Sequence, residues 1–585
     1  MLFPALLHDR LAAALAAADV AVPAGVAVDV SASQDARFGD YQTNIAMIAA
    51  KAAKTNPREL AGRIAAAFDG SGLCSETTIA GPGFINFRID PIVLAANVAA
   101  VARDPRAGVP ATTAPKTIVL DFSAPNVAKP MHVGHIRSTI LGDALTRIAR
   151  FLGHKVITDN HIGDWGTQFG MILHGWKSLR DGDKLAADPV PELLRIYREM
   201  NAAAKADPAV LETCKAELVK LQQGDPENLA IWTECVALTK TGLQKIYDVL
   251  DVHFDHWLGE SYYNDRLAPL VDDLIASGLA RESDGAICIF SGGDLPVEQD
   301  PFMANKDGEW KDNPSIIRKA DGGFLYATTD LATLDFRITA WQADEIWYVV
   351  GAPQQLHFRQ IFDAARRWGK PARCQHIAFG SILGDDRKLM KTRSGDNVQL
   401  ADVLTEAVDR ARTVINEKNP DLPEQEKAAI ATTVGIGAVK YAELSQHRLT
   451  DYVFSWDKML SLQGNTAPYL QNAYVRIQSI FRKAKDASAE AATTPALADP
   501  TEVALALKLA RFAEDVPAVL DDHRPNLLAN YLYDLATTFH SFYEACPVLK
   551  ADDATRASRL CLCAATARVL RTGLGLLGIN VPERM

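Results

Sequence analysis

Two histidines three residues apart, His132 and His135, lie where an apolar, strand-like segment (117–122) turns into a helical run. Such a turn leaves free backbone N–H groups and the positive end of a helix dipole at one place. Residues three apart on a helix share a side, so both imidazoles can donate hydrogen bonds to phosphate oxygens, while Gly134 leaves room for a base or ribose. Lys129 adds a cation. The junction therefore predicts a site for the phosphates of a nucleotide.

The flanking pattern decides whether these histidines are more than a chance helix cap. Apolar residues recur at helical spacing over 136–151, Gly153 ends the run, and 155–158 reads as a second strand. Strand, helix and strand together predict a βαβ unit, which is the context that a mononucleotide site needs. No phosphate-binding loop of the Gly-x-x-x-x-Gly-Lys-Ser/Thr type occurs in the sequence.

Segment 123–135, together with Gly163-Asp-Trp-Gly-Thr-Gln-Phe-Gly170, resembles the bacterial type of arginyl-tRNA synthetase, a class I family whose signature appears here as His132-Val-Gly-His135. Further similar stretches follow in one order along nearly the whole chain: 38–44, 81–88, 351–357, 389–395 and 464–471. The resemblance implies that arginine and ATP, the latter with Mg²⁺, give arginyl adenylate, and that tRNA(Arg) then takes the arginyl group. It also implies that arginine is activated only when tRNA is bound.

A second basic segment could stabilise charge on the leaving pyrophosphate. Class I enzymes carry Lys-Met-Ser-Lys there, whereas this chain has Lys388-Leu-Met-Lys391, followed by Arg393. Which of these cations replaces the catalytic lysine stays open, and a solvated basic loop is the alternative. The resemblance implies that Lys129 compensates for the altered loop. We expect catalysis to involve Lys129, His132, His135, Lys391 and Arg393, and ATP to contact His132, Gly134, His135, His357, Lys388 and Lys391.

Selecting arginine requires carboxylates, because a guanidinium group is planar, always charged and best held by bidentate acceptors. Asp121 ends the first strand, and Asp330 lies near the start of a helix, where its alternative role is a helix cap. The resemblance implies that Asp121, Tyr326 and Asp330 line the side-chain pocket. It places Ser123, Asn126 and Gln354 at the α-amino and carboxyl groups of arginine.

Candidate tRNA contacts lie near both ends of the chain. By resemblance, Phe84 and Asn86 match positions where an aromatic ring stacks on a D-loop base and an amide reads its edge. Tyr469, Arg476 and Met585 match the anticodon side, although Asn472 stands where relatives often have an aromatic residue. A strand with one core aromatic is the alternative for the first pair, and a solvated helix face for the basic segment around Arg476.

The length of 585 residues predicts several domains. We expect an α/β protein with three parts: an α+β tRNA-recognition domain (1–108), a Rossmann-like catalytic domain (116–440) with a helical insertion near 181–245, and an all-α anticodon-binding domain (441–585). Strand-like segments within these parts include 26–30, 85–89, 324–327 and 345–350.

Composition limits the remaining choices. The eight cysteines form no Cys-x-x-Cys pair, so we expect no protein-bound zinc. The chain has no apolar run of 18 residues, which predicts a cytoplasmic protein with no membrane partner, and we expect a monomer. The net charge of −11 does not exclude tRNA, because basic patches can be local. The alternatives are a tRNA-independent adenylyltransferase and an inactive tRNA-binding paralogue.

Overall fold

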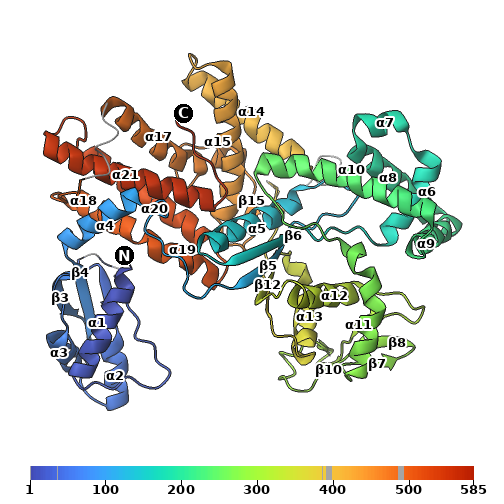
Figure 1. Ribbon diagram of the computed structural model, residues 1–585, viewed down its shortest axis with the longest axis horizontal. Helices are drawn as coiled ribbons and strands as arrows, with labels where there is room; N and C mark the ends of the chain where they lie inside the picture. Colours follow the sequence, from blue (N-terminus) through green and yellow to red (C-terminus); the bar gives the residue numbers. More distant parts are fainter. Residues whose placement is uncertain (1, 34, 36, 385, 391–397, 485–492) are drawn as a thin grey trace.

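A four-stranded parallel sheet with the strand order β13-β12-β5-β6 lies at the centre of the computed structural model (Figure 1), which describes residues 2–33, 35, 37–384, 386–390, 398–484 and 493–585. Its strands are β5 (Thr117–Asp121), β6 (Lys155–Asp159), β12 (Glu345–Tyr348) and β13 (Arg373–His376). The chain moves outward from β5 to β6 on one side and from β12 to β13 on the other. The order therefore reverses between β5 and β12, and ligands of such sheets bind beyond the carboxyl ends of the strands at that point.

Two helices bring side chains to this edge. Helix α5 (Val133–Phe151) joins β5 to β6, and it begins three residues before the predicted 136 because His132 caps it. Helix α12 (Tyr326–Thr339) precedes β12. The strand predicted at 324–327 is wrong, since Phe324 forms only an isolated bridge with Arg318 and the helix begins at Tyr326.

Helices at the right of Figure 1 fill the region between β6 and β12 where an insertion was predicted. Aspartates cap several of them, and prolines at their first positions favour helix starts. The helices are α6 (Thr167–Leu179), α7 (Gly182–Ala187), α8 (Pro189–Ala206), α9 (Pro208–Gln222) and α10 (Pro226–Leu250).

A smaller antiparallel region follows, which the sequence analysis did not foresee. One sheet has the order β11-β8-β7, and β9 pairs with β10 in a hairpin. The elements are η1 (Glu260–Tyr263), α11 (Asn264–Ala276), β7 (Ala280–Ser283), β8 (Ala286–Ile289), β9 (Met303–Lys306), β10 (Glu309–Asp312) and β11 (Ser315–Arg318), and beyond β12 come η2 (Ala352–Gln354) and α13 (Gln355–Arg367).

The first part of the chain carries a separate antiparallel sheet of order β1-β2-β4-β3, at the lower left of Figure 1. The predicted strand at 26–30 is wrong, because pairing begins only at Ser31. The elements are α1 (Phe3–Ala17), β1 (Ser31–Ala32), β2 (Tyr41–Thr43), α2 (Ile45–Ala53), α3 (Pro57–Ala67), β3 (Cys74–Ala80), β4 (Phe84–Ile89) and α4 (Pro91–Arg103). Helix α4 packs on α18 and α21 of the C-terminal bundle.

The last part is a helical bundle, apart from two short strands, β14 (Ile382–Leu383) and β15 (Tyr452–Val453), which pair in parallel. Its helices are α14 (Leu400–Lys418), α15 (Glu424–Leu444), α16 (Trp456–Met459), α17 (Ala467–Ala484), α18 (Pro500–Ala510), α19 (Phe512–Asp521), α20 (Pro525–Ala545) and α21 (Asp553–Leu576). Helix α15 runs without a break through the predicted boundary at 440. Among the described residues, no helix has the length and apolar character needed to cross a bilayer.

Candidate active site

The ring nitrogens of the two signature histidines accept backbone N–H groups at the start of α5. His132 is the N-cap, and its Nδ1 accepts the Gly134 N–H at 3.0 Å. The His135 Nδ1 accepts the His132 backbone N–H at 3.1 Å, and the two rings lie 4.0 Å apart. A Cβ at Gly134 would come within 2.9 Å of the His132 ring. The geometry therefore explains both the histidine spacing and the glycine between them.

These contacts also fix the protonation state of the histidines. A ring nitrogen that accepts a backbone N–H carries no proton, so each proton resides on Nε2, which is left to donate. Burial lowers the pKa of His132, and the Lys129 charge lowers it further. Burial, with a smaller effect from His132, lowers the pKa of His135 to about 4. At neutral pH both side chains are uncharged hydrogen-bond donors rather than cations.

The turn before α5 is held by the motif that begins at Gly163. Asn126 forms a parallel bridge with Gly163, and the Val127 N–H donates to the Gly163 carbonyl at 3.0 Å. A Cβ at Gly163 would lie 2.2 Å from the Asn126 side-chain oxygen. The side chain of Asn126 is exposed, whereas Ser123 is buried and hydrogen-bonded internally. Of these two predicted contacts to the amino-acid backbone, Asn126 is the more accessible, and Ser123 is 6% exposed.

The second signature loop is tied to the same turn. The Val133 N–H donates to the Val398 carbonyl and the Leu400 N–H to the Met131 carbonyl, both at 2.9 Å. At the other end of the loop, Met390 pairs back to Ile382 in β14. The described flanks of the loop are thus anchored on the signature turn and on β14.

The predicted catalytic cations differ in where they lie. Lys388 is exposed, and its N–H donates to an Asp386 carboxylate oxygen at 3.0 Å. Lys391 and Arg393 lie outside the described residues. Lys129 extends toward the helical insertion, where its Nζ lies 4.5 Å from the centre of the Tyr197 ring in α8. It lines a cavity of about 540 Å³ between α8, α10 and Gln399.

Carboxylates gather near the N-terminus of α12. Asp330 accepts a hydrogen bond from the His357 Nε2 at 2.5 Å, which brings together two residues predicted for different ligands. Tyr326 begins the helix and is 69% exposed. Burial and the charge of Glu260 raise the pKa of the Tyr326 hydroxyl. Gln354 lies exposed in η2, just beyond the carboxyl end of β12.

Glu260 is a residue that the sequence analysis missed. Burial, together with the charges of Asp164 and Asp330, raises its pKa to about 7, although His161 and the Trp165 N–H oppose the shift. Asp164 itself holds the turn that contains Glu260, because its carboxylate accepts the Ser261 N–H at 2.9 Å and the Ser261 hydroxyl at 2.7 Å. Glu260 lies in a short 3₁₀ turn with no motif, so only the fold brings it to Asp330.

Asp121 has a partner within the chain. It ends β5, in register with Asp159 of β6, and both carboxylates bind Arg337 of α12, at 2.8 and 2.9 Å. All three side chains are buried, and burial raises the pKa of Asp121 although Arg337 opposes this. The carboxylate predicted to bind a substrate guanidinium therefore already binds one from α12, and this pair fixes the carboxyl edge of the sheet.

The predicted tRNA contacts in the first sheet differ in accessibility. Phe84, Asn86 and Arg88 share one face of β4 because strand side chains alternate. Phe84 is partly exposed, but Asn86 is only 2% exposed. Asn86 pairs with Gln42 of β2 and Thr78 of β3 on either side. As the strands lie, Phe84 can meet a base directly, while the Asn86 amide is covered.

In the C-terminal bundle, Arg476 and Met585 line a cavity of about 480 Å³ together with Asn472. The Arg476 guanidinium lies 5.4 Å from the centre of the Tyr543 ring. Further cations complete the lining: Arg482, Lys483 and Arg584. Tyr469 does not line this cavity, and its hydroxyl hydrogen-bonds His540 at 2.7 Å.

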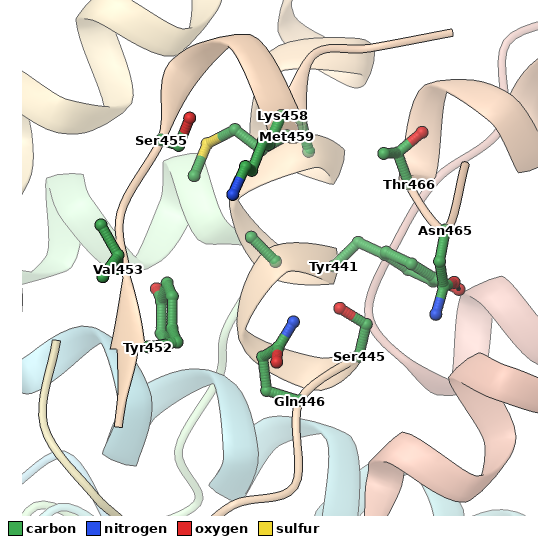
Figure 2. A pocket seen from close by; sticks show the side chains of 12 residues that line it. Tyr441, Ser445, Gln446, Tyr452, Val453, Ser455, Lys458, Met459, Asn465 and Thr466 are labelled. Carbon is green, nitrogen blue, oxygen red and sulfur yellow. Dashed lines mark hydrogen bonds between the residues drawn. The ribbon is translucent and has the colours of Figure 1, made fainter. Parts of the chain in front are cut away.

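Figure 2 shows a second, smaller cavity, where α15 meets β15, α16 and the start of α17. Tyr441 donates to the Asn465 side chain at 2.5 Å, and Tyr452 hydrogen-bonds Glu443. Its volume of about 110 Å³ is below the roughly 300–1,000 Å³ of ligand pockets, so we assign it no substrate. Glu443 also pairs with the buried Arg137 of α5 at 3.0 Å, which joins the bundle to the signature helix.

Comparisons with protein families match the three parts of the chain separately. Residues 97–456 match the family described as tRNA synthetases class I (R), catalytic domain. Residues 470–585 match the DALR anticodon binding domain, and residues 5–89 match the arginyl tRNA synthetase N terminal domain.

Individual relatives match over their full length. The chain is 46% identical over 587 residues, 99% of both chains, to an arginine–tRNA ligase of Cellvibrio japonicus. It is 46% identical over 554 residues, 94% of both chains, to an arginine–tRNA ligase of Thermobifida fusca. Among solved structures, arginyl-tRNA synthetase from Thermus thermophilus superposes with a TM-score of 0.83 at 26% identity, covering 100% of each chain. The Plasmodium falciparum enzyme gives 0.82 at 27% identity, covering 100% of this chain and 99% of its own.

Proposed function

The chain belongs to the arginyl-tRNA synthetase family, whose members are arginine–tRNA ligases, and on this premise we propose which residues bind and activate arginine. The observation that carries the assignment is the pair of carboxylates at the start of α12, where the charge of Asp330 contributes to the raised pKa of the buried Glu260. A guanidinium between them would offset their mutual repulsion and donate hydrogen bonds to both carboxylates.

We propose that this guanidinium is that of the substrate. Asp330 and Glu260 accept its N–H groups, and the exposed ring of Tyr326 packs on its plane. Asp121 lies beneath this pocket and acts indirectly: it binds Arg337 and thereby holds α12 in place. At the other end of arginine, Asn126 and Gln354 lie on the two sides of the strand reversal and take the α-amino and carboxyl groups, with Ser123 beneath them.

ATP would bind over the signature turn. The Nε2–H groups of His132 and His135 donate to phosphate oxygens, and Gly134 lies under the nucleoside. The carboxylate of arginine then attacks the α-phosphate, forming a mixed anhydride as the bond to pyrophosphate breaks. Because both histidines are neutral, positive charge for the leaving pyrophosphate comes from Lys129 and the loop cations Lys388, Lys391 and Arg393. His357 orients Asp330 and would lie between that residue and the nucleotide.

Mg²⁺ enters as the partner of ATP, which the family uses as substrate. In the described part of the chain, no group of three or more His, Cys, Asp or Glu side chains is arranged to hold a metal ion. We propose that the phosphates of ATP carry the magnesium ion and that the signature histidines and Lys129 bind those phosphates. The absence of zinc, a monomeric state and a cytoplasmic location stay predictions.

For tRNA(Arg), we propose two contact regions at the ends of the chain. The basic cavity lined by Arg476, Tyr543 and Met585 suits anticodon nucleotides, because it combines cations with an aromatic face. The outer face of the first sheet, with Phe84 partly exposed beside Asn86, suits a single unstacked base. Residues 1–108 and 441–585 would thus recognise tRNA, and 116–440 would carry the chemistry.

One experiment tests the assignment as a whole. Exchange of labelled pyrophosphate into ATP is measured with each of the twenty amino acids, with and without tRNA. We expect exchange with arginine alone among the amino acids, and only when tRNA is present. Robust exchange without tRNA would favour the adenylyltransferase alternative, and no exchange under any condition would favour an inactive paralogue.

A further inference from the structure

The turn that carries the signature motif contains left-handed residues that are not glycine. Ser123, Ala124 and Ala128 have φ values of 72°, 45° and 62°. The Ala124 N–H donates to the Phe122 carbonyl at 3.0 Å, which closes a γ-turn centred on Ser123 in its rare, positive-φ form. Such a backbone persists only where its surroundings hold it, and it clusters at functional sites.

Each of the three left-handed residues gives its backbone N–H to a side-chain oxygen. Ser123 donates to the Ser138 Oγ at 2.8 Å, from within α5. Ala124 also donates to the Asn160 Oδ1 at 3.1 Å, just beyond β6. Ala128 donates to the Thr239 Oγ1 at 3.2 Å, from α10. The strained turn is therefore held by side chains from three elements.

The orientation of the Thr239 hydroxyl is determined by its other partner. Thr239 is fully buried and donates its single proton to the Cys235 carbonyl at 2.8 Å. Its oxygen can therefore only accept, and the Ala128 N–H fills that role. Lys129 follows Ala128 directly, so Thr239 sets where the backbone of Lys129 begins.

A second contact from α10 reaches the opposite end of the turn. The Asn160 amide donates to the Tyr247 hydroxyl at 3.0 Å, and Tyr247 and Ser123 lie 2.7 Å apart. Ser123 contacts the Thr139 hydroxyl at 2.9 Å, and Thr139 donates to the His135 carbonyl at 2.8 Å. Each hydroxyl has one proton, so the chain has one direction: Tyr247 donates to Ser123, which donates to Thr139. Ser123 keeps only acceptor capacity toward a ligand.

We propose that Thr239 and Tyr247 are positioning residues for arginine activation, which hold the strained turn from one buried face of α10. They lie eight residues apart, about two helical turns, with the buried Leu243 midway, so all three share one face. Thr239 acts through Lys129, and Tyr247 acts through Ser123, whose acceptor orientation suits the α-ammonium group of arginine. This inference rests on the proposed roles of Lys129 and Ser123. The inference makes α10, the last helix of the insertion, a structural part of the active site.

The test for Thr239 compares Thr239→Val, which removes the acceptor at equal volume, with Thr239→Ser, which keeps it. Valine leaves the buried Ala128 N–H without an acceptor. If the turn shifts to relieve this cost, kcat of pyrophosphate exchange with tRNA present should fall about 10- to 100-fold. We expect that fall for valine, rescue by serine, and less than about a twofold further loss when valine is placed in a Lys129→Ala background. Thr566→Val is the matched control, because Thr566 is a fully buried helix threonine of α21 that donates to the Leu562 carbonyl.

The test for Tyr247 is independent. Tyr247→Phe should raise the KM for arginine about tenfold or more while the KM for ATP changes little. Agmatine, which keeps the α-amino group of arginine, should inhibit this variant more weakly than the unchanged protein. Inhibition by 5-guanidinopentanoate, which lacks that group, should stay the same. Tyr531→Phe is the control, since its buried hydroxyl donates to the Lys508 carbonyl in the bundle. Thermal unfolding of each variant separates lost stability from lost positioning.

Two outcomes would overturn the inference. One is an equal loss from Thr239→Val with and without Lys129, which would mean that Thr239 acts only on stability. The other is a parallel rise in the KM of arginine and ATP, or equal weakening of both inhibitors, for Tyr247→Phe. If Lys129→Ala alone leaves kcat unchanged, the proposed role of Lys129 is wrong, and not the positioning role of Thr239. The Tyr247→Phe result then still tests the positioning role of Tyr247.

Discussion

Replacing Asp330 by asparagine tests the arginine pocket most directly. The change keeps the size of the side chain and removes one of the two charges that face the proposed guanidinium. Asparagine can still accept one hydrogen bond, including that of His357 now at 2.5 Å. The effect on arginine binding therefore isolates the charge from the shape of the site.

The structure sets the size of the effect. Two unit charges about 4 Å apart interact by about 4 kcal/mol at an effective dielectric constant of about 20. The Asp330 side chain is 22% exposed, and Glu260 remains as a second carboxylate, so only part of this energy is lost. We expect a loss of about 2–3 kcal/mol, which corresponds to about a 30- to 150-fold rise in the KM for arginine. The KM for ATP should change by less than about threefold, because the nucleotide is proposed to meet Asp330 only through His357.

Both constants are measured by pyrophosphate exchange at pH 8 with saturating tRNA. Asp335→Asn is the matched control, since Asp335 lies on the same helix but pairs with Lys370, away from Glu260. An unchanged arginine KM would mean that Asp330 only holds His357. An equal rise in both KM values would place the pair at the nucleotide and refute the proposed pocket.

Three further results are expected. Because the pKa of Glu260 is raised to about 7, the free site is protonated below that pH, so the arginine KM should rise about tenfold per unit as pH falls below 7 and stay level above it; Glu260→Gln should flatten this profile. Lys129→Ala should lower kcat of exchange at saturating ATP and arginine, whereas a loss confined to the ATP KM would contradict a role in the transition state; Lys391→Ala and Arg393→Ala, compared in the same assay, rank the loop cations. Phe84→Ala should raise the KM for tRNA with no change in equilibrium binding of arginine, and an unchanged tRNA KM would leave Phe84 a core residue.

Truncation of the first part needs a boundary that the packing allows. The sequence placed the end of this part at 108, but α4 packs on α18 and α21 of the bundle. Removing α4 would take away its buried Leu94, Val98 and Val101 and uncover the surfaces of α18 and α21 on which the helix packs. A deletion that ends at Ile89, after β4, keeps α4 in place and separates tRNA recognition from stability.

The sequence was sufficient where chemistry and local structure coincide. The strand, turn and helix around His132 are contiguous, and the apolar periodicity of α5 is visible without the fold. The motif residues that flank the sheet reversal could be proposed from the sequence for the same reason. Glu260 shows the limit, because it joins Asp330 only through contacts between segments seventy residues apart in the chain.

The strand that was predicted wrongly and the Asp121 contact that was not foreseen have a similar cause. Phe324-Leu-Tyr-Ala has the apolar and aromatic content of a strand, but α12 begins inside it, where Tyr326 is free of the sheet. Asp121 was paired with a ligand because its own partner, Arg337, lies 216 residues away. A buried arginine gives no periodic signal in the sequence. Only the tertiary structure shows that Arg337 forms ion pairs with Asp121 and Asp159 at the strand ends.

The neutrality of the histidines bears on why tRNA should be needed for activation. If His132 and His135 supply donors without charge, transition-state charge depends on Lys129 and the loop cations, which lie on segments held by other parts of the molecule. Lys129 contacts α8 and follows a residue held by α10, while the loop is anchored at β14, which pairs with β15 beside the C-terminal bundle. The insertion and the bundle thus set the distance between the cations and the turn. A partner that contacts both can bring the cations to the phosphates, and tRNA would be such a partner if it binds the bundle as proposed while its terminal ribose enters the active site.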